Sequence, residues 1–195
     1  MFYVFPKAVK RDTCEKIVKD CKQNILKKAS ILDYNEKSSI DNPDIRKTSV
    51  YFITERDNKI NELVWGFLRE ANKIQFHYAL EYFQAVQFAE YKNGGFYDWH
   101  QDETGLNVSG EIRKLSLTLV LSDPDNFDGG ELQFYNGGRS MEDIFGEMEG
   151  KRAKDDIKAQ GTVIVFDSRD WHRVTPVTRG IRHSIVCWTV GANFR

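Results

Sequence analysis

The sequence predicts a mainly β protein with flanking helices, an α+β fold with an antiparallel barrel or jelly roll at its core. Apolar residues recur at helical spacing in the first part of the chain, and short β-rich runs separated by Gly, Asp, Asn and Pro follow from about residue 84. At 195 residues the chain has the length of one domain. We therefore expect residues 1–83 to form a support region of helices and a strand, and residues 84–195 to form the β domain of a single structural unit.

The charge balance and the cysteines limit the partners and the compartment. With 28 basic and 29 acidic residues the formal net charge is -1, so no nucleic-acid partner is expected. No apolar stretch approaches the roughly 20 residues that span a bilayer, so no membrane partner is expected. Cys14, Cys21 and Cys187 are not spaced as a metal motif, and residues 1–12 lack the apolar run of a signal peptide. These features predict a reducing, cytoplasmic setting.

The first predicted element is an amphipathic helix over residues 12–29. Its start, Asp12 to Glu15, has the form of a capping box, and apolar residues follow at helical spacing. Cys14 and Cys21 share the apolar stripe of this helix, so both thiols are expected to be buried.

Three further segments complete the N-terminal region. Residues 33–46 are polar and turn-rich, which predicts a loop or a mobile flap, and residues 48–54 predict a strand. Apolar residues at helical spacing from 60 to 74 predict a second, longer helix. Two amphipathic helices are therefore expected to precede the β domain.

The β domain is predicted from five β-rich runs, which are residues 84–91, 114–121, 131–135, 161–167 and 182–191. The acidic segment 122–132 between two of them breaks the EF-hand pattern, because Phe127 and Asp128 occupy the fifth position and the glycine position. A tight turn is predicted there instead of a calcium site. Residues 137–160 are too charged for a core strand and predict a surface excursion.

A metal-ligand spacing lies in the stretch YDWHQD, residues 97–102. Residues two apart on a strand point to the same side, so His100 and Asp102 would present an imidazole nitrogen and a carboxylate together. His172, just beyond an apolar run, is the natural third ligand. Two histidines and one carboxylate on one face of an octahedron are typical of non-haem Fe(II) oxygenases. His-x-Asp also occurs by chance, and a surface hydrogen bond is the alternative.

The last β-rich run carries the second part of the candidate site. A period of two sends Arg182 and Ser184 to one face and His183 to the other. An arginine that points into a small barrel is costly unless an anion meets it, and a bound dicarboxylate would be such a partner because guanidinium forks pair bidentately with carboxylates. His183 and His77, the latter near the end of a helix, are not expected to be ligands.

The aromatics beside the first ligand are predicted to lie elsewhere. Tyr97 and Trp99 alternate with His100, so a regular strand would pack both outside the metal pocket. A bulge or the end of the strand would overturn this expectation.

With these motifs in order, residues 84–191 resemble the 2-oxoglutarate- and Fe(II)-dependent dioxygenases, in particular the prolyl 4-hydroxylase type and its small microbial and viral relatives. The resemblance implies a double-stranded β-helix (jelly-roll) core and Fe(II) bound by His100, Asp102 and His172. It also implies 2-oxoglutarate and O2 as cosubstrates, with ascorbate as a candidate reductant.

The resemblance further implies roles for residues that would bind 2-oxoglutarate. Arg182, ten positions after the distal histidine, would hold the far carboxylate together with Ser184. Tyr91 would donate a hydrogen bond to the same carboxylate, and Trp188 would lie behind the cosubstrate. Many prolyl 4-hydroxylases have lysine where Arg182 stands, which is a departure toward other branches of the superfamily. The alternative for Tyr91 and Trp188 is a core aromatic.

The implied activity is hydroxylation of a C–H bond, first of all in a prolyl residue of a peptide or protein, with release of succinate and CO2. Residues 33–46 and 103–113 are long enough to cover such a site. The alternatives are a free amino acid or small-metabolite substrate and a non-catalytic jelly-roll binding module; Zn(II) or Mn(II) could also occupy the ligands. A nucleic-acid demethylase is disfavoured, because Trp188 stands where a second arginine would be expected.

Overall fold

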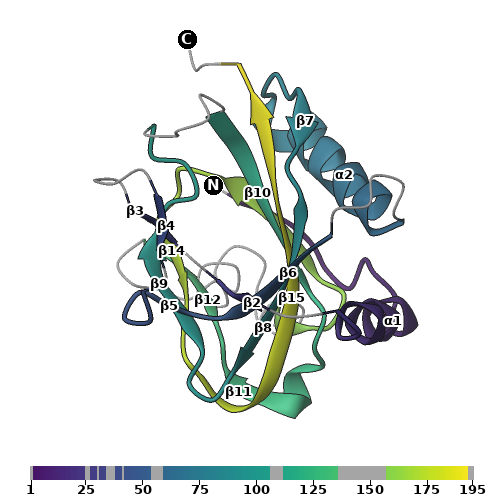
Figure 1. Ribbon diagram of the computed structural model, residues 1–195. Coiled ribbons are helices and arrows are strands. Elements are labelled where there is room, and N and C mark those ends of the chain that lie inside the picture. The colour runs from purple at the N-terminus through teal and green to yellow at the C-terminus, as the bar shows by residue number, and fades with distance from the viewer. Residues whose placement is uncertain are drawn as a thin grey trace.

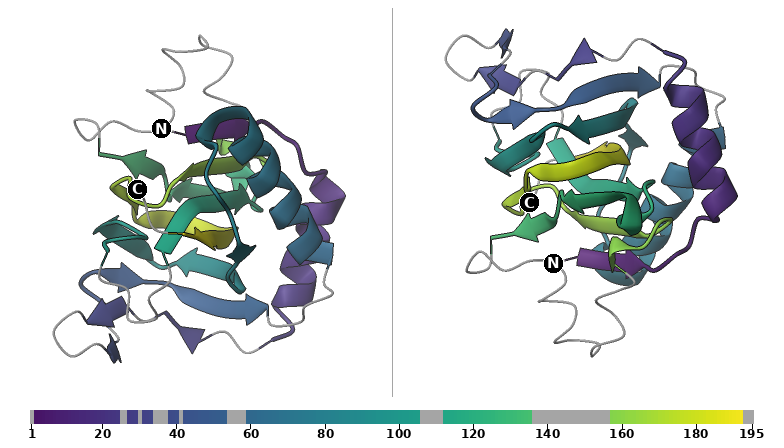
Figure 2. Two further views of the ribbon diagram at one scale, coloured as in Figure 1. Left: turned by 90° about the horizontal axis from the view of Figure 1, so that it is seen from above. Right: turned by 90° about the horizontal axis from the view of Figure 1, so that it is seen from below.

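The computed structural model describes residues 2–24, 27–29, 31–33, 38–40, 42–53, 59–105, 112–135 and 157–192. Two antiparallel sheets lie face to face, and two helices run along the outer side of the larger sheet (Figure 1). The views from above and below show the same layers (Figure 2). The elements in chain order are β1 (Phe2–Phe5), α1 (Arg11–Cys21), β2 (Lys27–Lys28), β3 (Ile31–Asp33), β4 (Ser38–Ile40), β5 (Arg46–Lys47), β6 (Ser49–Ile53), α2 (Lys59–Ala71), the π-helix η1 (Asn72–Phe76), β7 (Tyr82–Phe83), β8 (Val86–Lys92), β9 (Phe96–His100), β10 (Ile112–Val120), the 3-10 helix η2 (Pro124–Asn126), β11 (Phe127–Gly129), β12 (Leu132–Phe134), β13 (Val163–Asp167), β14 (His172–Val174) and β15 (Val177–Gly191).

The larger sheet has the order β1-β13-β10-β15-β8-β6-β2, with β7 and β11 paired to β15, and the smaller sheet has the order β12-β14-β9-β5. A mainly β fold with antiparallel sheets and two leading helices was the sequence prediction, and it is confirmed. Strands from before residue 84 pair within both sheets, since β6 lies beside β8 and β5 beside β9. The N-terminal region thus supplies strands as well as helices.

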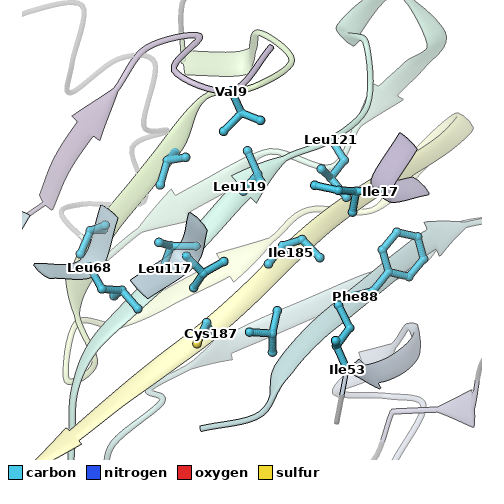
Figure 3. Packing of buried hydrophobic residues seen from close by; sticks show 14 of the residues in the cluster. Val9, Ile17, Ile53, Leu68, Phe88, Leu117, Leu119, Leu121, Ile185 and Cys187 are labelled. Atoms are coloured by element: carbon cyan, nitrogen blue, oxygen red, sulfur yellow. The ribbon is translucent and has the colours of Figure 1, made fainter. Parts of the chain in front are cut away.

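Alternation along the strands of the larger sheet produces two apolar layers. The outer core lies between this sheet and the helices and is drawn in Figure 3, where the labelled members are Val9, Ile17, Ile53, Leu68, Phe88, Leu117, Leu119, Leu121, Ile185 and Cys187. The inner core lies between the two sheets and includes Ala89, Leu132, Phe134, Phe166 and Val174. Each fully buried Leu, Ile, Val or Phe contributes about 1.5–3 kcal/mol relative to exposure, so the outer core is a main source of stability.

The first helix is shorter than the sequence predicts. It ends at Cys21, not near residue 29, because a turn follows and Lys27–Lys28 pairs with β6. The predicted capping box is also wrong. Lys10 is the N-cap residue and makes no side-chain cap bond, while Glu15 accepts a hydrogen bond from Arg11 at 2.8 Å. The predicted apolar stripe is confirmed, since Cys14 and Cys21 are both buried.

The second helix, the strand at residues 48–54 and the five later β-rich runs are confirmed, with shifts of a few residues at their ends. Helix α2 continues into the π-helix as far as Phe76. The turn prediction for residues 122–132 holds only at the end of the segment, where Gly129 and Gly130 adopt positive φ values of 74° and 64°. Before that turn the segment contains η2 and the strand β11, which pairs with β15. Among the described residues, the helices are too short or too polar to cross a membrane.

Three predicted surface segments are only partly covered by the described residues. The segment 33–46 is not simply a loop, since β4 pairs with β3 and β5 pairs with β9. Residues 34–37 and 41 lie outside the described ranges, as do residues 106–111 of the segment 103–113. Most of the predicted excursion, residues 137–156, is outside them too.

Candidate metal and cosubstrate site

Three ligand-type residues meet at one end of the smaller sheet. His100 is the last residue of β9, Asp102 follows two positions later, and His172 opens β14 directly opposite His100 in the ladder. One ligand atom from each of the three lies within 4.8 Å of the others. The Nε2 atoms of His100 and His172 are 3.6 and 3.5 Å from the carboxylate oxygens of Asp102, too far for good hydrogen bonds. The three side chains therefore surround a common point without closing on it.

Both imidazoles are held with Nε2 toward that point. His100 Nδ1 lies 2.7 Å from the carbonyl oxygen of Asp98, and His172 Nδ1 lies 2.8 Å from that of Asp170. A carbonyl only accepts hydrogen bonds, so each Nδ1 carries the proton and each Nε2 keeps its lone pair. Burial, and next the neighbouring His100, lower the pKa of His172 to about 4. The distal imidazole is therefore neutral at physiological pH, as a metal ligand must be.

The carboxylate of Asp102 is buried and anchored by a hydroxyl. Burial by itself raises the pKa of Asp102, but the two histidines and Arg113 lower it by more, so the group stays ionised. Ser116 donates to Asp102 Oδ2 at 2.6 Å and contacts the hydroxyl of Ser168 at 2.9 Å. These contacts fix the orientation of the carboxylate.

The second part of the site lies on the inner face of the larger sheet. The sequence predicts Arg182 and Ser184 on one face of β15, and the structure places both in the pocket that contains the histidines. Arg182 Nη1 donates to Ser184 Oγ at 3.2 Å, and its guanidinium lies 5.3 Å from the ring centroid of Tyr91. Trp188 also lines the pocket, beneath the guanidinium of Arg113 at 4.3 Å. All four residues that the resemblance assigned to 2-oxoglutarate are thus neighbours of the pocket.

A glycine makes room for the buried arginine. A Cβ atom on Gly130 would lie 2.7 Å from Cδ of Arg182 and 2.9 Å from a methyl group of Val177. Gly130 also has a φ of 64°, in the region that favours glycine. The turn before β12 therefore supports the position of Arg182.

The prediction for Tyr97 is wrong, and that for Trp99 agrees with the structure. The β9–β14 ladder pairs His172 with His100 but Val174 with Tyr97, so β9 holds one extra residue in a bulge. This turns Tyr97 into the pocket, where its ring stacks on His100 at 3.5 Å between centroids. Trp99 packs against Tyr135 on the other side.

The two remaining histidines lie away from the pocket, as expected. His183 faces the outer core, where its Nε2 is 3.1 Å from Glu90 Oε2 and its ring stacks on Phe88. His77 ends the π-helix with a φ of 58°. Neither belongs to the group of three ligand-type residues.

Among the lining residues that the sequence analysis did not assign to the site is a buried arginine. Arg46, from the segment predicted to be a loop, is 9% exposed and lies over the ring of Tyr97 at 4.4 Å. Arg46 reaches the pocket because β5 pairs with β9. No local pattern in this two-residue strand indicates that long-range contact.

The donor set of the pocket fits an anionic, oxygen-rich ligand beside a metal ion. Nε1 of Trp188 and Nε of Arg46 are buried donors without a hydrogen-bond acceptor. Asp102 is the acidic residue among those that line the pocket, and its carboxylate faces the histidines. A bound molecule that brings carboxylate or keto oxygens would supply the missing acceptors.

Comparisons with known proteins agree with this geometry. Residues 86–190 match the family model of the 2OG-Fe(II) oxygenase superfamily. A PKHD-type hydroxylase of Pseudomonas putida strain W619 is 35% identical over 103 residues, which are 51% of this chain and 40% of that protein. A PKHD-type hydroxylase of Teredinibacter turnerae is 38% identical over 105 residues, 52% of this chain and 41% of the relative. The chain thus matches about two fifths of the length of these relatives.

Solved structures share the fold. A prolyl-4-hydroxylase from Pseudomonas putida superposes with a TM-score of 0.70 at 21% identity, covering 98% of this chain and 93% of the other. A viral collagen prolyl hydroxylase from Paramecium Bursaria Chlorella virus-1, solved with 2-oxoglutarate, gives 0.69 at 17% identity and covers 98% and 96%. The two sheets and their helices therefore form the jelly-roll arrangement of these proteins.

Proposed function

The chain belongs to the 2OG-Fe(II) oxygenase superfamily, and from this premise we propose that it is an Fe(II)- and 2-oxoglutarate-dependent dioxygenase that hydroxylates a C–H bond. The observation that carries the proposal is the group of His100, Asp102 and His172 in one pocket with the buried Arg182. The two parts of the site come from opposite sheets, so the fold itself brings them together.

The metal would be held by Nε2 of each histidine and by the carboxylate of Asp102. Three ligands on one face leave positions open for other molecules, and this is the donor set that non-haem Fe(II) oxygenases use. The hydrogen bonds from Nδ1 to the carbonyls of Asp98 and Asp170 support the role, because partners of this kind fix the ring orientation of metal-bound histidines.

The far carboxylate of 2-oxoglutarate would be held by Arg182 and Ser184, with a hydrogen bond from Tyr91, and Trp188 would lie beside the cosubstrate. The short chain of contacts from Tyr91 through Arg182 to Ser184 supports these roles. When bound, Fe(II), 2-oxoglutarate and O2 supply the oxidising chemistry, with succinate and CO2 as the other products and ascorbate as the candidate reductant. The protein orients the ligands and excludes water from the pocket.

A prolyl residue in a peptide or protein is the first substrate to test. Its support is the fold shared with prolyl hydroxylases of bacterial and viral origin. A free amino acid or small metabolite is the second candidate, favoured by Arg46, whose Nε is buried without an acceptor. The expected cytoplasmic location stays a prediction.

The test is succinate formation by the purified protein with Fe(II), 2-oxoglutarate and O2, with and without proline-rich peptides or free amino acids. A stimulation of succinate release by peptides would support the prolyl substrate. In the same assay His172→Ala should form no succinate above the background, while His77→Ala should behave as the unchanged protein. A His172→Ala variant that consumed 2-oxoglutarate at the original rate would refute the site, and a protein without any turnover would favour a non-catalytic binding module.

A further inference from the structure

A second buried arginine lines the pocket and is not among the residues proposed to hold the metal or the far carboxylate of 2-oxoglutarate. Arg46 lies in the smaller sheet, whereas Arg182 lies in the larger sheet on the other side of the pocket. Its side chain is 9% exposed, and Nε is buried without an acceptor. Among the residues that the structure describes, no acidic side chain forms an ion pair with it.

The contact that Arg46 does make cannot neutralise its charge. Its guanidinium lies 4.4 Å from the ring centroid of Tyr97, and that ring stacks in turn on His100. A cation over an aromatic face is attracted by the ring, but the N–H groups at the edge of the guanidinium still need acceptors.

The other charges of the pocket are already matched. The carboxylate of Asp102 faces the two histidines, where it would meet the metal ion. The charge of Arg182 would be met by the far carboxylate of 2-oxoglutarate. Arg46 is then the remaining cation of the lining, and burying an unmatched cation is costly. A further anion is needed in the complete complex.

We infer that Arg46 binds a carboxylate of the substrate beside the metal position. This inference rests on the proposed function and specifies its substrate class. Guanidinium forks pair bidentately with carboxylates, so the contact would orient the substrate over the metal as well as attract it. The carboxylate can belong to a free amino acid or C-terminal residue, or to an acidic side chain within a peptide. A prolyl residue with only neutral neighbours would leave Arg46 unmatched.

The experiment measures binding without turnover. Mn(II) replaces Fe(II) in the protein loaded with 2-oxoglutarate, and calorimetry compares the N-acetyl derivatives of the common amino acids as free acids and as primary amides. At least one free acid should bind about tenfold or more tightly than its amide. The primary amides of N-acetyl-aspartate and N-acetyl-glutamate keep a side-chain carboxylate, whereas those of N-acetyl-asparagine and N-acetyl-glutamine do not. If the first two bind more tightly than the last two, the carboxylate that Arg46 binds belongs to a side chain.

Variants assign the preference to Arg46. In Arg46→Gln the difference between acid and amide should vanish, whereas Arg46→Lys should keep the charge and part of the difference. Arg173→Gln is the matched control, because Arg173 stacks on Trp99 away from the pocket and its loss should change nothing. Circular dichroism of each variant reports whether it is folded, and if Arg46→Gln does not fold, Arg46→Lys carries the comparison.

Three outcomes would overturn the inference. One is equal binding of acids and amides by the unchanged protein, and another is a preference that survives in Arg46→Gln. The third is a variant that loses affinity for 2-oxoglutarate while the preference stays, since Arg46 would then serve the cosubstrate. Failure of the proposed function is distinguishable, because it would appear as an unchanged protein that does not bind 2-oxoglutarate with Mn(II). The binding of free acids and amides would then be compared by calorimetry with the metal-free protein.

Discussion

The two faces of strand β15 differ in what they bury. Toward the helices the strand presents Ile185 and Cys187, which are enclosed in the outer core. Toward the smaller sheet it presents Arg182, Ser184 and Trp188, which border the candidate site. Ile185 and Cys187 meet apolar partners and His183 on the same face meets Glu90, while Trp188 on the inner face has a buried donor without an acceptor. One alternating strand thus serves stability on one side and ligand binding on the other.

The largest effect is expected on the inner side of the molecule, from Asp102→Ala. Removal of the buried carboxylate takes away one of the three proposed ligands and leaves two histidines, so metal affinity should fall by at least about a hundredfold and turnover should disappear. Asp98→Ala is the matched control, because this aspartate is exposed and lies four positions earlier, in β9. Calorimetric Fe(II) titration under anaerobic conditions checks both variants. Equal losses in the two would show that the effect is not specific to the site.

The outer face should respond in stability instead of metal binding. Ile185→Ala should lower the free energy of unfolding by about 2–5 kcal/mol, since the side chain is fully buried. Ile181→Ala on the same strand, where the side chain is 37% exposed, should change it by about 0.5 kcal/mol or less. Urea unfolding measures the difference. If folded Ile185→Ala lost Fe(II) affinity while its free energy of unfolding hardly changed, the division of roles between the two faces would be contradicted.

A smaller effect is expected from the hydroxyl that anchors the carboxylate. Ser116→Ala removes the 2.6 Å hydrogen bond to Asp102 and should weaken metal binding by about 10- to 100-fold. Ser122→Ala is the comparison on the other side, because its hydroxyl contacts the backbone of His183 and not the site. Metal titration of both variants at equal pH measures this difference. An unchanged affinity in Ser116→Ala would show that the hydroxyl does not support metal binding.

The smallest effect concerns the support of Arg182. Gly130→Ala should weaken binding of 2-oxoglutarate by about tenfold, because the new methyl group would displace the stem of Arg182. Gly94→Ala has a similar positive φ, 75° against 64°, but the added carbon would meet only Nζ of Lys47, at an ordinary contact distance of 3.9 Å. Both variants should lose about 1 kcal/mol of stability, but only the first should lose affinity. If both lose affinity equally, backbone strain and not the contact with Arg182 is the cause.

The sequence predicts those parts of the site that lie on regular strands. Arg182 and Ser184 share a face because β15 alternates without interruption in that stretch, so their common pocket follows from a period of two. Tyr97 escapes the same rule, because the bulge in β9 depends on how this strand pairs with β14. No residue pattern within β9 marks the extra residue.

Arg46 and the end of the first helix were missed for a related reason. The apolar pattern continues past Cys21, but pairing of Lys27–Lys28 with β6 takes the chain out of the helix. Arg46 reaches the pocket through a two-residue strand beside β9. Contacts between segments far apart in the chain decide both features, as they decide the bulge in β9, whereas local propensity and periodicity were enough to place most of the helices and strands.

The most direct test of the proposed site is an anaerobic titration of the protein with Fe(II) and then 2-oxoglutarate, followed by visible absorption. A 2-oxo acid chelated to Fe(II) gives a weak charge-transfer band, so the unchanged protein should develop this band with one equivalent of each component. Asp102→Ala should not develop it, and Arg182→Ala should need a much higher concentration of 2-oxoglutarate. A protein that binds Fe(II) but gives no band at saturating 2-oxoglutarate would contradict the proposed activity.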